Sequence, residues 1–180
     1  MDADSIVLGS GDVYVMEFSG DLPEDATIET EANRLGYIQG GASIEYKPTF
    51  YEAKDDFKKK VKTIVTEEEA TFKTGIFTWF GETLEKLCST ARVTDDAEGK
   101  VRTVKIGGAE NNDGKRYVIH FVHKDKADGD VRVTIVGKNQ SGFTLAFAQD
   151  KETVIDAEFR AEPCDDDGTL IVYKETYEAA

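Results

Sequence analysis

Alternating apolar and polar residues predict an antiparallel β protein. Period-two patterns, which are typical of half-buried strands, recur along the chain and are separated by turn signals such as Asp113-Gly114. In Tyr117–His123 both faces are apolar, which predicts a strand that is covered on both sides. The strands predicted in this way are Asp12–Phe18, Val101–Ile106, Tyr117–His123, Val131–Val136, Phe143–Ala148, Val154–Glu162 and Leu170–Tyr177.

The longest pattern predicts a β-hairpin over residues 42–80. Its arms, Ala42–Ala53 and Val61–Phe80, are rich in β-branched and aromatic residues and flank a charged tip. Each arm is about twice as long as an ordinary strand of five to six residues, so part of the hairpin is expected to project from the domain and to need a partner. Gly40-Gly41 predicts a kink or a bulge before the hairpin. The tip comprises Lys54, Asp55, Asp56, Phe57, Lys58, Lys59 and Lys60.

The sequence predicts one helix, which begins at Phe80 or Gly81 and ends at Ala91. An apolar stripe at positions i, i+3, i+4 and i+7 indicates that this helix flanks a sheet. The segment 1–11, which ends in Gly9-Ser10-Gly11, is predicted to be a flexible N-terminal arm. Ser19–Asn33 is an acidic connection without a clear helical or strand period.

Composition narrows the function classes. A length of 180 residues with 39% hydrophobic residues predicts one folded domain over 1–180. The net charge is −14, and the excess acid lies in residues 1–50 and 151–180. Because nucleic-acid binding depends on cations that neutralise phosphates, this excess of negative charge argues against tight binding of DNA or RNA. No signal peptide or membrane span is expected, and Cys88 and Cys164 are expected to be reduced thiols.

Candidate catalytic and metal-binding residues do not form a convincing site. A spacing of three places His120 and His123 on opposite faces of a strand, which argues against a shared metal. Asp165–Gly168 has consecutive acids, which is typical of a turn and not of a calcium loop. The run Glu67–Glu69 has no nucleophile or histidine nearby. We therefore predict that the protein is not an enzyme and uses no metal or cofactor.

Two interpretations remain open for the lysines at the hairpin tip. Lys58-Lys59-Lys60 forms either an ordinary solvated loop end or a cationic prong that contacts acidic surface on another copy of the chain.

The order of these parts resembles that of the tail tube (major tail) proteins of tailed bacteriophages, which are related to the tubes of contractile injection particles. The resemblance covers nearly the whole chain. It rests on Leu35–Ala42 opening a long strand, the hairpin that extends to Thr78-Trp79, the helix Glu82–Ala91 directly after it, and the ending Phe159–Leu170.

The resemblance implies an antiparallel β-sandwich or barrel with one flanking helix and a long projecting hairpin. Six copies would form a ring, rings would stack into a hollow tube, and the hairpin and N-terminal arm would reach the adjacent ring. DNA would pass through the bore without specific binding. Further partners would be the tape measure protein, the tail terminator, baseplate or initiator proteins and, in a contractile tail, the sheath. The protein would be located in the virion tail after assembly in the host cytoplasm.

Two rows of charged residues are candidates for the surface that faces such a bore. Strand alternation places each row on one face, and acid in the bore would repel phosphates. The candidate residues are Glu45 and Lys47 in one row and Asp156, Glu158, Arg160 and Glu162 in the other.

Two alternatives remain. The tube of a type VI-like secretion or bacteriocin injection particle would form similar rings with a different cargo. A monomeric β-sandwich binding module would share the fold class without assembling.

Overall fold

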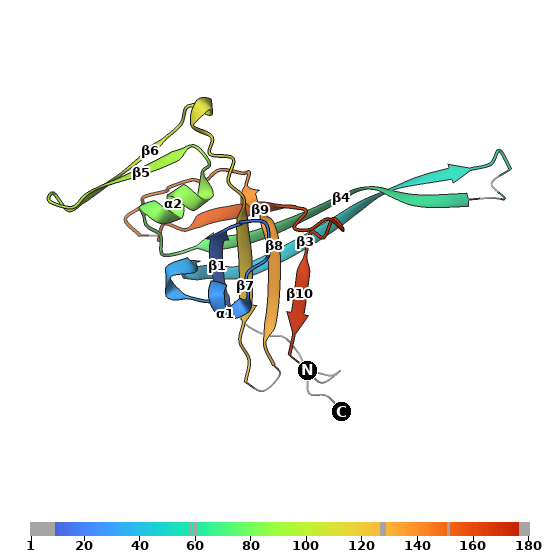
Figure 1. The fold of residues 1–180 in the computed structure, drawn as a ribbon, viewed down its shortest axis with the longest axis horizontal. Helices are drawn as coiled ribbons and strands as arrows, with labels where there is room; N and C mark the ends of the chain where they lie inside the picture. Colours follow the sequence, from blue (N-terminus) through green and yellow to red (C-terminus); the bar gives the residue numbers. More distant parts are fainter. Residues whose placement is uncertain (1–9, 58, 60, 127–128, 151, 177–180) are drawn as a thin grey trace.

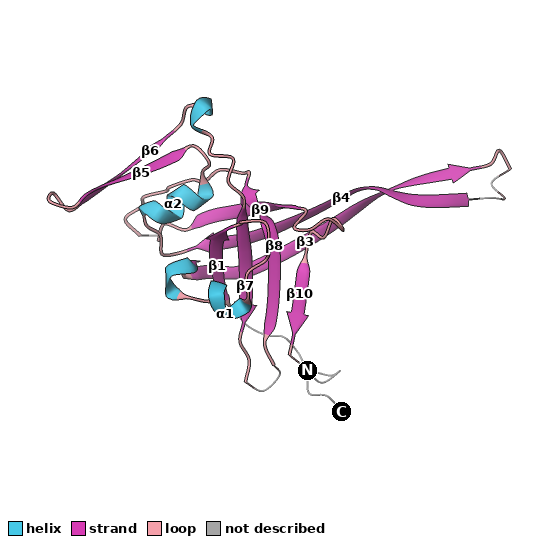
Figure 2. Ribbon diagram, viewed as in Figure 1, coloured by secondary structure: helices cyan, strands magenta, loops and turns pink. Residues whose placement is uncertain are grey.

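The computed structural model describes residues 10–57, 59, 61–126, 129–150 and 152–176, and these confirm a mainly β protein with antiparallel sheets (Figure 2). The strands are β1 (Asp12–Glu17), β2 (Arg34–Gly36), β3 (Ile38–Lys54), β4 (Val61–Ile76), β5 (Ala91–Asp96), β6 (Val101–Ile106), β7 (Tyr117–His123), β8 (Val131–Asn139), β9 (Ile155–Glu162) and β10 (Val172–Glu175). The α-helices are α1 (Asp25–Ile28) and α2 (Gly81–Leu87), and short 3-10 turns lie at Glu31–Asn33 and Ala109–Asn111.

Eight strands form one sheet, which divides at β8. The order is β2-β1-β7-β8-β9-β4-β3, and β10 pairs separately with β8. The first half of β8, Val131–Thr134, pairs with β10, whereas Val136–Asn139 pairs with β9. The sheet therefore continues from β8 in two directions, and the long pair β3–β4 extends to the right in Figure 1. Strands β5 and β6 form a separate two-stranded sheet.

Strands β1, β7 and β8 lie between two apolar clusters, because apolar residues occupy both of their faces. The prediction that Tyr117–His123 is covered on both sides is confirmed, since six of its seven residues are buried. One cluster includes Ile119 and Phe159 and is also packed by Leu84 and Leu87 of α2. The opposite cluster lies under residues 19–33, which we call the strap, with Ile28 of α1 at its centre.

Three predictions about individual elements were wrong. The helix ends at Leu87 instead of Ala91, because Cys88 is already extended (φ −141°, ψ 110°) and Ala91 begins β5, a strand that the apolar stripe concealed. Phe143–Ala148 is not a strand, although Phe143 and Leu145 pack against the larger cluster. The prediction of a single helix was also wrong, because the strap, which has no clear period, contains a second helix, α1, and a 3-10 turn.

Strands β3 and β4 pair antiparallel from Ile38↔Ile76 to Lys54↔Val61. The register shifts between Gln39 and Ala42, which confirms the predicted bulge. Gly40 and Gly41 have φ values of +83° and +80° there, a region that residues with a Cβ rarely adopt. A second register shift follows Thr49. The strands thus start before the predicted arm at Ala42, and β4 ends at Ile76, before Phe80.

Candidate functional site

Five of the six charged candidates from the sequence lie together on one face of β3, β4 and β9. Register places Glu45 opposite Thr71, and Thr71 is opposite Arg160 on the other side of β4. In the next row, Ser43, Lys73 and Glu158 are neighbours across the same three strands. Residues that share such a row point to the same face of the sheet. The charged face, as we call it, consists of Glu45, Lys47, Glu69, Lys73, Asp156, Glu158 and Arg160.

Opposite charges alternate across the charged face. Lys73 Nζ lies 3.2 Å from Glu158 Oε2, and Arg160 Nε lies 3.5 Å from Glu69 Oε1. Lys47 Nζ lies 3.0 Å from Glu45 Oε2, and this carboxylate is the main reason why the pKa of Lys47 is raised. The face holds three cations and four carboxylates, so its net charge is small although the chain as a whole is strongly acidic. The sixth candidate, Glu162, lies where β9 pairs with β8, within 4 Å of Arg116 and Lys138.

The opposite face of the same strands is apolar near the core. There Ile44, Phe72 and Phe159 form one row across β3, β4 and β9, and Phe72 and Phe159 are buried. This part of the hairpin is therefore anchored by a third strand on one side and by the larger cluster on one face.

In the described part of the chain, the outer half of the hairpin (residues 48–57 and 61–67) has neither support. Strand β9 contacts β4 only along Thr71–Ile76 among these residues. Phe50 pairs with Val65 and Tyr51 with Ile64, so successive pairs place apolar side chains on both faces of the ribbon. These four side chains remain exposed, with 57% of Phe50 accessible. Burying each large apolar side chain is worth about 1.5–3 kcal/mol, so this ribbon is well suited to a contact with a partner.

The described residues of the hairpin tip are exposed. Phe57, whose side chain is 80% accessible, is the most exposed large apolar residue among those described, and Lys59 Nζ lies 5.8 Å from the centre of its ring. Lys54 pairs with Glu52 on the same strand, and Asp55 and Asp56 lead into the turn. Lys58 and Lys60 lie outside the described residues, so the two interpretations of the lysine run stay open.

Strand β3 forms an edge of the sheet, because in the described part of the chain it pairs only with β4. A groove of about 740 Å³ lies beside its bulge, between Gln39–Ser43 and the connection from β8 to β9. Lys73, Asp156 and Glu158 of the charged face also line this groove. Unpaired backbone groups along an edge strand can accept a further strand.

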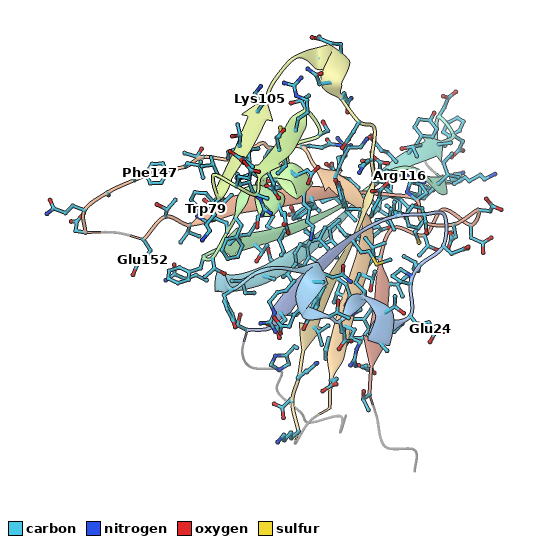
Figure 3. All side chains as sticks on the ribbon, turned by 60° about the vertical axis from the view of Figure 1, so that its left-hand side comes forward. Glu24, Trp79, Lys105, Arg116, Phe147 and Glu152 are labelled. Carbon is cyan, nitrogen blue, oxygen red and sulfur yellow. The ribbon has the colours of Figure 1, made fainter. Side chains whose placement is uncertain are left out.

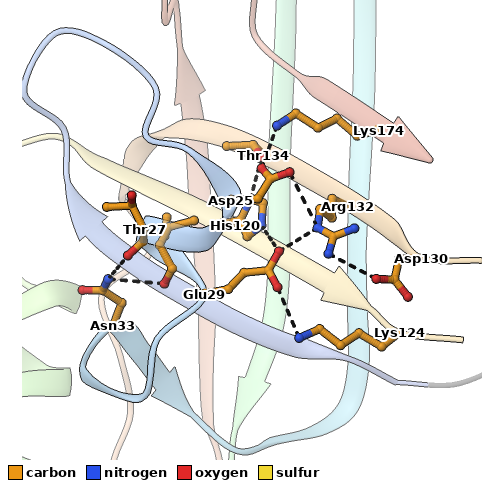
Figure 4. A network of polar contacts seen from close by, with 11 residues as sticks. Asp25, Thr27, Glu29, Asn33, His120, Lys124, Asp130, Arg132, Thr134 and Lys174 are labelled. Carbon is orange, nitrogen blue, oxygen red and sulfur yellow. Dashed lines mark hydrogen bonds and ion pairs between the residues drawn. The ribbon is translucent and has the colours of Figure 1, made fainter. Parts of the chain in front are cut away.

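A network of ion pairs fixes the strap on β7, β8 and β10 (Figure 4). Glu29 Oε1 accepts a hydrogen bond of 2.6 Å from Arg132 Nε, and its other oxygen lies 3.2 Å from Lys124 Nζ. Asp25 of α1 pairs with Lys174 of β10 at 2.6 Å. Sequence reasoning missed this network. The spacing of Asp25 and Glu29 by four residues was the available signal, and it was hidden in an acidic segment without clear periodicity.

His120 of β7 also belongs to this network, because its buried ring contacts both Glu29 and Thr134. Its ring is 1% accessible, Nδ1 lies 2.8 Å from Thr134 Oγ1, and Nε2 lies 3.5 Å from Glu29 Oε1. Burial is the largest influence on the pKa of His120 and lowers it, although Glu29 opposes this effect. Burial alone would raise the pKa of Glu29, but hydrogen bonds from Arg132 and Lys124 outweigh burial and lower it.

The remaining candidates occupy separate places. His123 Nδ1 lies 2.7 Å from the carbonyl of Ser10, on the opposite face of β7 from His120, as the spacing predicted. Asp165 accepts a hydrogen bond from the Thr169 N–H, and Gly168 bonds back to its carbonyl, which confirms the predicted turn. Cys88 and Cys164 are free thiols. Among the described residues, no group of three or more His, Cys, Asp and Glu is arranged to hold a metal ion.

No family model matches the sequence, and no curated protein matches it either. In the described residues, none of the helices has the length and apolar character that crossing a membrane requires.

Proposed function

We propose that this chain is the structural subunit of a phage tail tube, in which six copies form a ring and rings stack into a hollow conduit. The observation that carries the proposal is the outer half of the hairpin, which exposes apolar residues on both faces and pairs with no third strand among the residues that the structure describes. A ribbon of this kind gains stability when another molecule covers it. We take the fold to be a β-sandwich in which α2 is the flanking helix and β3–β4 the projecting hairpin.

The open edge of β3 supports assembly into a closed ring. Strand addition at this edge by a neighbouring copy would satisfy its backbone groups and continue the sheet from one subunit to the next. The hairpin would then reach the adjacent ring through its tip, Lys54–Lys60. Contacts between unlike surfaces give a closed ring when the rotation between copies closes and an open filament when it does not, so rings joined head to tail by the hairpin form a filament of open length.

The charged face supports a role as the lining of the bore. Cations and carboxylates are paired across this face, which includes Glu45, Lys73, Glu158 and Arg160. The face therefore offers phosphates little net attraction. DNA can therefore slide past it without lasting contacts. We assign Glu162 to the continuation of this surface onto β8. Within the tail, the tape measure protein occupies the bore before DNA, and initiator and terminator proteins contact the two ends of the tube.

Electron microscopy of the purified protein tests the proposal directly. Rings and stacked tubes are expected at high protein concentration or after addition of a tail initiator complex. Particles that remain single and compact under all these conditions would contradict the proposal and favour a monomeric binding module.

Paired variants test the role of the hairpin. Phe50→Asp combined with Ile64→Asp places charge on both faces of the ribbon and is expected to prevent stacking while leaving the monomer folded. Tyr173→Asp is the matched control, because Tyr173 is similarly exposed but lies on β10. Deletion of residues 57–60 should also leave a folded monomer that stacks poorly. Tubes of normal length from the deletion variant would exclude the tip from the contact between rings.

The tube of a secretion or bacteriocin particle would share these surfaces. The cargo distinguishes the two functions, because only a phage tail tube protects DNA from nuclease while DNA passes through it. Nuclease protection in isolated particles that contain this chain therefore tests the choice.

A further inference from the structure

The β5–β6 hairpin is a second projecting ribbon, which points to the side opposite β3–β4 in Figure 1. It is a two-stranded sheet of its own, and such a sheet is marginally stable unless something packs against it. One of its faces rests on α2 through Val104, which contacts the larger cluster. Among the described residues nothing covers the other face.

The hairpin is held in a fixed direction. Arg102 binds Asp95 through two hydrogen bonds of 2.7 and 2.8 Å and pairs with Glu82 of α2 at 2.8 Å. A Cβ on Gly81 would lie 2.7 Å from the Arg102 side chain, so the helix and the ribbon approach as closely as glycine allows. The ribbon is therefore pre-organised for a contact, which reduces the entropy lost on binding.

The uncovered face is basic. Arg92 and Lys105 are directly opposite each other in the register, and Figure 3 labels Lys105 on this ribbon. Like charges in this position are unfavourable. Within the described residues neither side chain forms an ion pair with a carboxylate, and Arg92 reaches only the carbonyl of Gly107 at 3.4 Å. Asp96 lies four residues further along β5, where its carboxylate accepts the N–H groups of Glu98 and Gly99 in the turn, and among the described residues it forms no ion pair with Arg92 or Lys105.

The chain also carries a matching acidic surface. Asp166 and Asp167 are exposed in the turn between β9 and β10, and among the residues described neither pairs with a cation. Asp165 makes this turn rigid by accepting the N–H of Thr169 at 2.9 Å. Two copies at −14 repel each other in general, so a contact that brings a basic surface onto an acidic one is favoured between them.

We propose that the basic face of β5–β6, formed by Arg92 and Lys105, docks on the Asp166-Asp167 turn of a second copy. This inference rests on the proposed function in one respect, namely that the partner is another subunit. It adds a contact separate from the long hairpin, between two unlike surfaces of neighbouring copies. Because the surfaces are unlike, each copy offers one of each, and the contact can repeat around a ring.

Charge reversal tests the contact. Variant A carries Arg92→Glu and Lys105→Glu, and variant B carries Asp166→Lys and Asp167→Lys. Each variant alone places like charges together and should assemble at least about tenfold more weakly than the unmodified chain in sedimentation velocity. An equal mixture of A and B restores attraction at every contact when the copies alternate, so assembly should recover. Recovery also shows that both variants are folded.

The control variant is Lys100→Glu with Lys126→Glu, which makes the same change in net charge outside the basic face. It should assemble like the unmodified chain. If variant A alone assembles normally, or if the mixture does not recover, the inference is overturned and the proposed function stands. If the unmodified chain is monomeric under all conditions, both are overturned.

Discussion

The inner and outer ends of the β3–β4 hairpin have similar sequences but differ strongly in how far their side chains are buried. Both halves of β4 are rich in β-branched residues, yet Phe72 is buried and Ile64, eight residues earlier, is exposed. The difference is the neighbourhood, because Thr71–Ile76 has β9 on one side and the larger cluster beneath it. The comparison teaches that strand-forming residues specify a ribbon, and that packing decides which part of it belongs to the core.

Removing a large side chain from each end tests this difference most strongly. Phe72→Ala should lower the free energy of unfolding by about 3–5 kcal/mol, because it leaves a cavity in the larger cluster. Phe50→Ala should change it by less than about 0.5 kcal/mol, since Phe50 is exposed in the monomer. Urea unfolding of both variants at low protein concentration provides the measurement. Equal losses would show that the outer half is packed in the monomer.

The centre of the sheet also contains largely buried ion pairs such as Arg132–Glu29, whereas the Lys54–Glu52 pair of the outer hairpin is about half exposed. Glu29→Gln should lower the free energy of unfolding by about 1–3 kcal/mol, because Arg132 loses its closest partner while retaining Asp130 at 3.1 Å. Denaturant midpoints measured against the unmodified chain check this loss. Asp56→Asn at the hairpin tip is the control, and a similar loss there would contradict the comparison.

Acid should act on the centre before it affects the hairpin. The pKa of His120 is lowered in the folded state, so unfolded chains bind more protons and stability should fall as the pH drops below about 6.5. The pKa of Glu29 is also lowered, so a further loss follows below its ordinary range near 4.5. Thermal unfolding from pH 8 down to about pH 2 measures both steps, because the loss from Glu29 continues until the pH has fallen through its lowered pKa. His120→Gln should remove the first step, and its persistence would assign that step to another group.

The smallest effect is expected on the charged face. Glu158→Gln breaks the ion pair with Lys73, in which both side chains are nearly half accessible. Such surface pairs contribute about 0.2–1 kcal/mol, and less at high salt. The difference in unfolding free energy between variant and unmodified chain should be small at 50 mM salt and smaller still at 500 mM salt. If Glu158→Gln lowered the free energy of unfolding by about 2 kcal/mol or more, the ion pair would be buried from water and the expectation of a weak surface contact would be wrong.

Local patterns predicted the strand class and several particular features. The bulge at Gly40-Gly41, the doubly covered strand Tyr117–His123 and the turn at Asp165 all depend on residues within a few positions of each other. The apolar stripe from Leu84 to Ala91 predicted too long a helix, because helix and strand periodicities cannot be told apart in a segment of this length.

The charged face shows the limit of such reasoning for the site. Alternation identified Glu45 and Lys47 as one row and Glu158 and Arg160 as another. The two rows lie on one face only because β4 pairs with β3 on one side and with β9 on the other, which alternation does not reveal. Lys73 and Glu69, which neutralise the face, come from the strand between them. The pairing of Glu29 with Arg132, 103 residues away, was equally inaccessible.

The sequence by itself determined that this chain forms antiparallel strands and a long hairpin with a bulge, because alternation, turn residues and glycines act over short distances. Only the tertiary structure decided which strands are neighbours, and therefore that five candidate charges share one face and that the strap is fixed by Glu29. The physical reason is that strand pairing and ion pairs join residues far apart in the chain, where a local pattern carries no information about the partner.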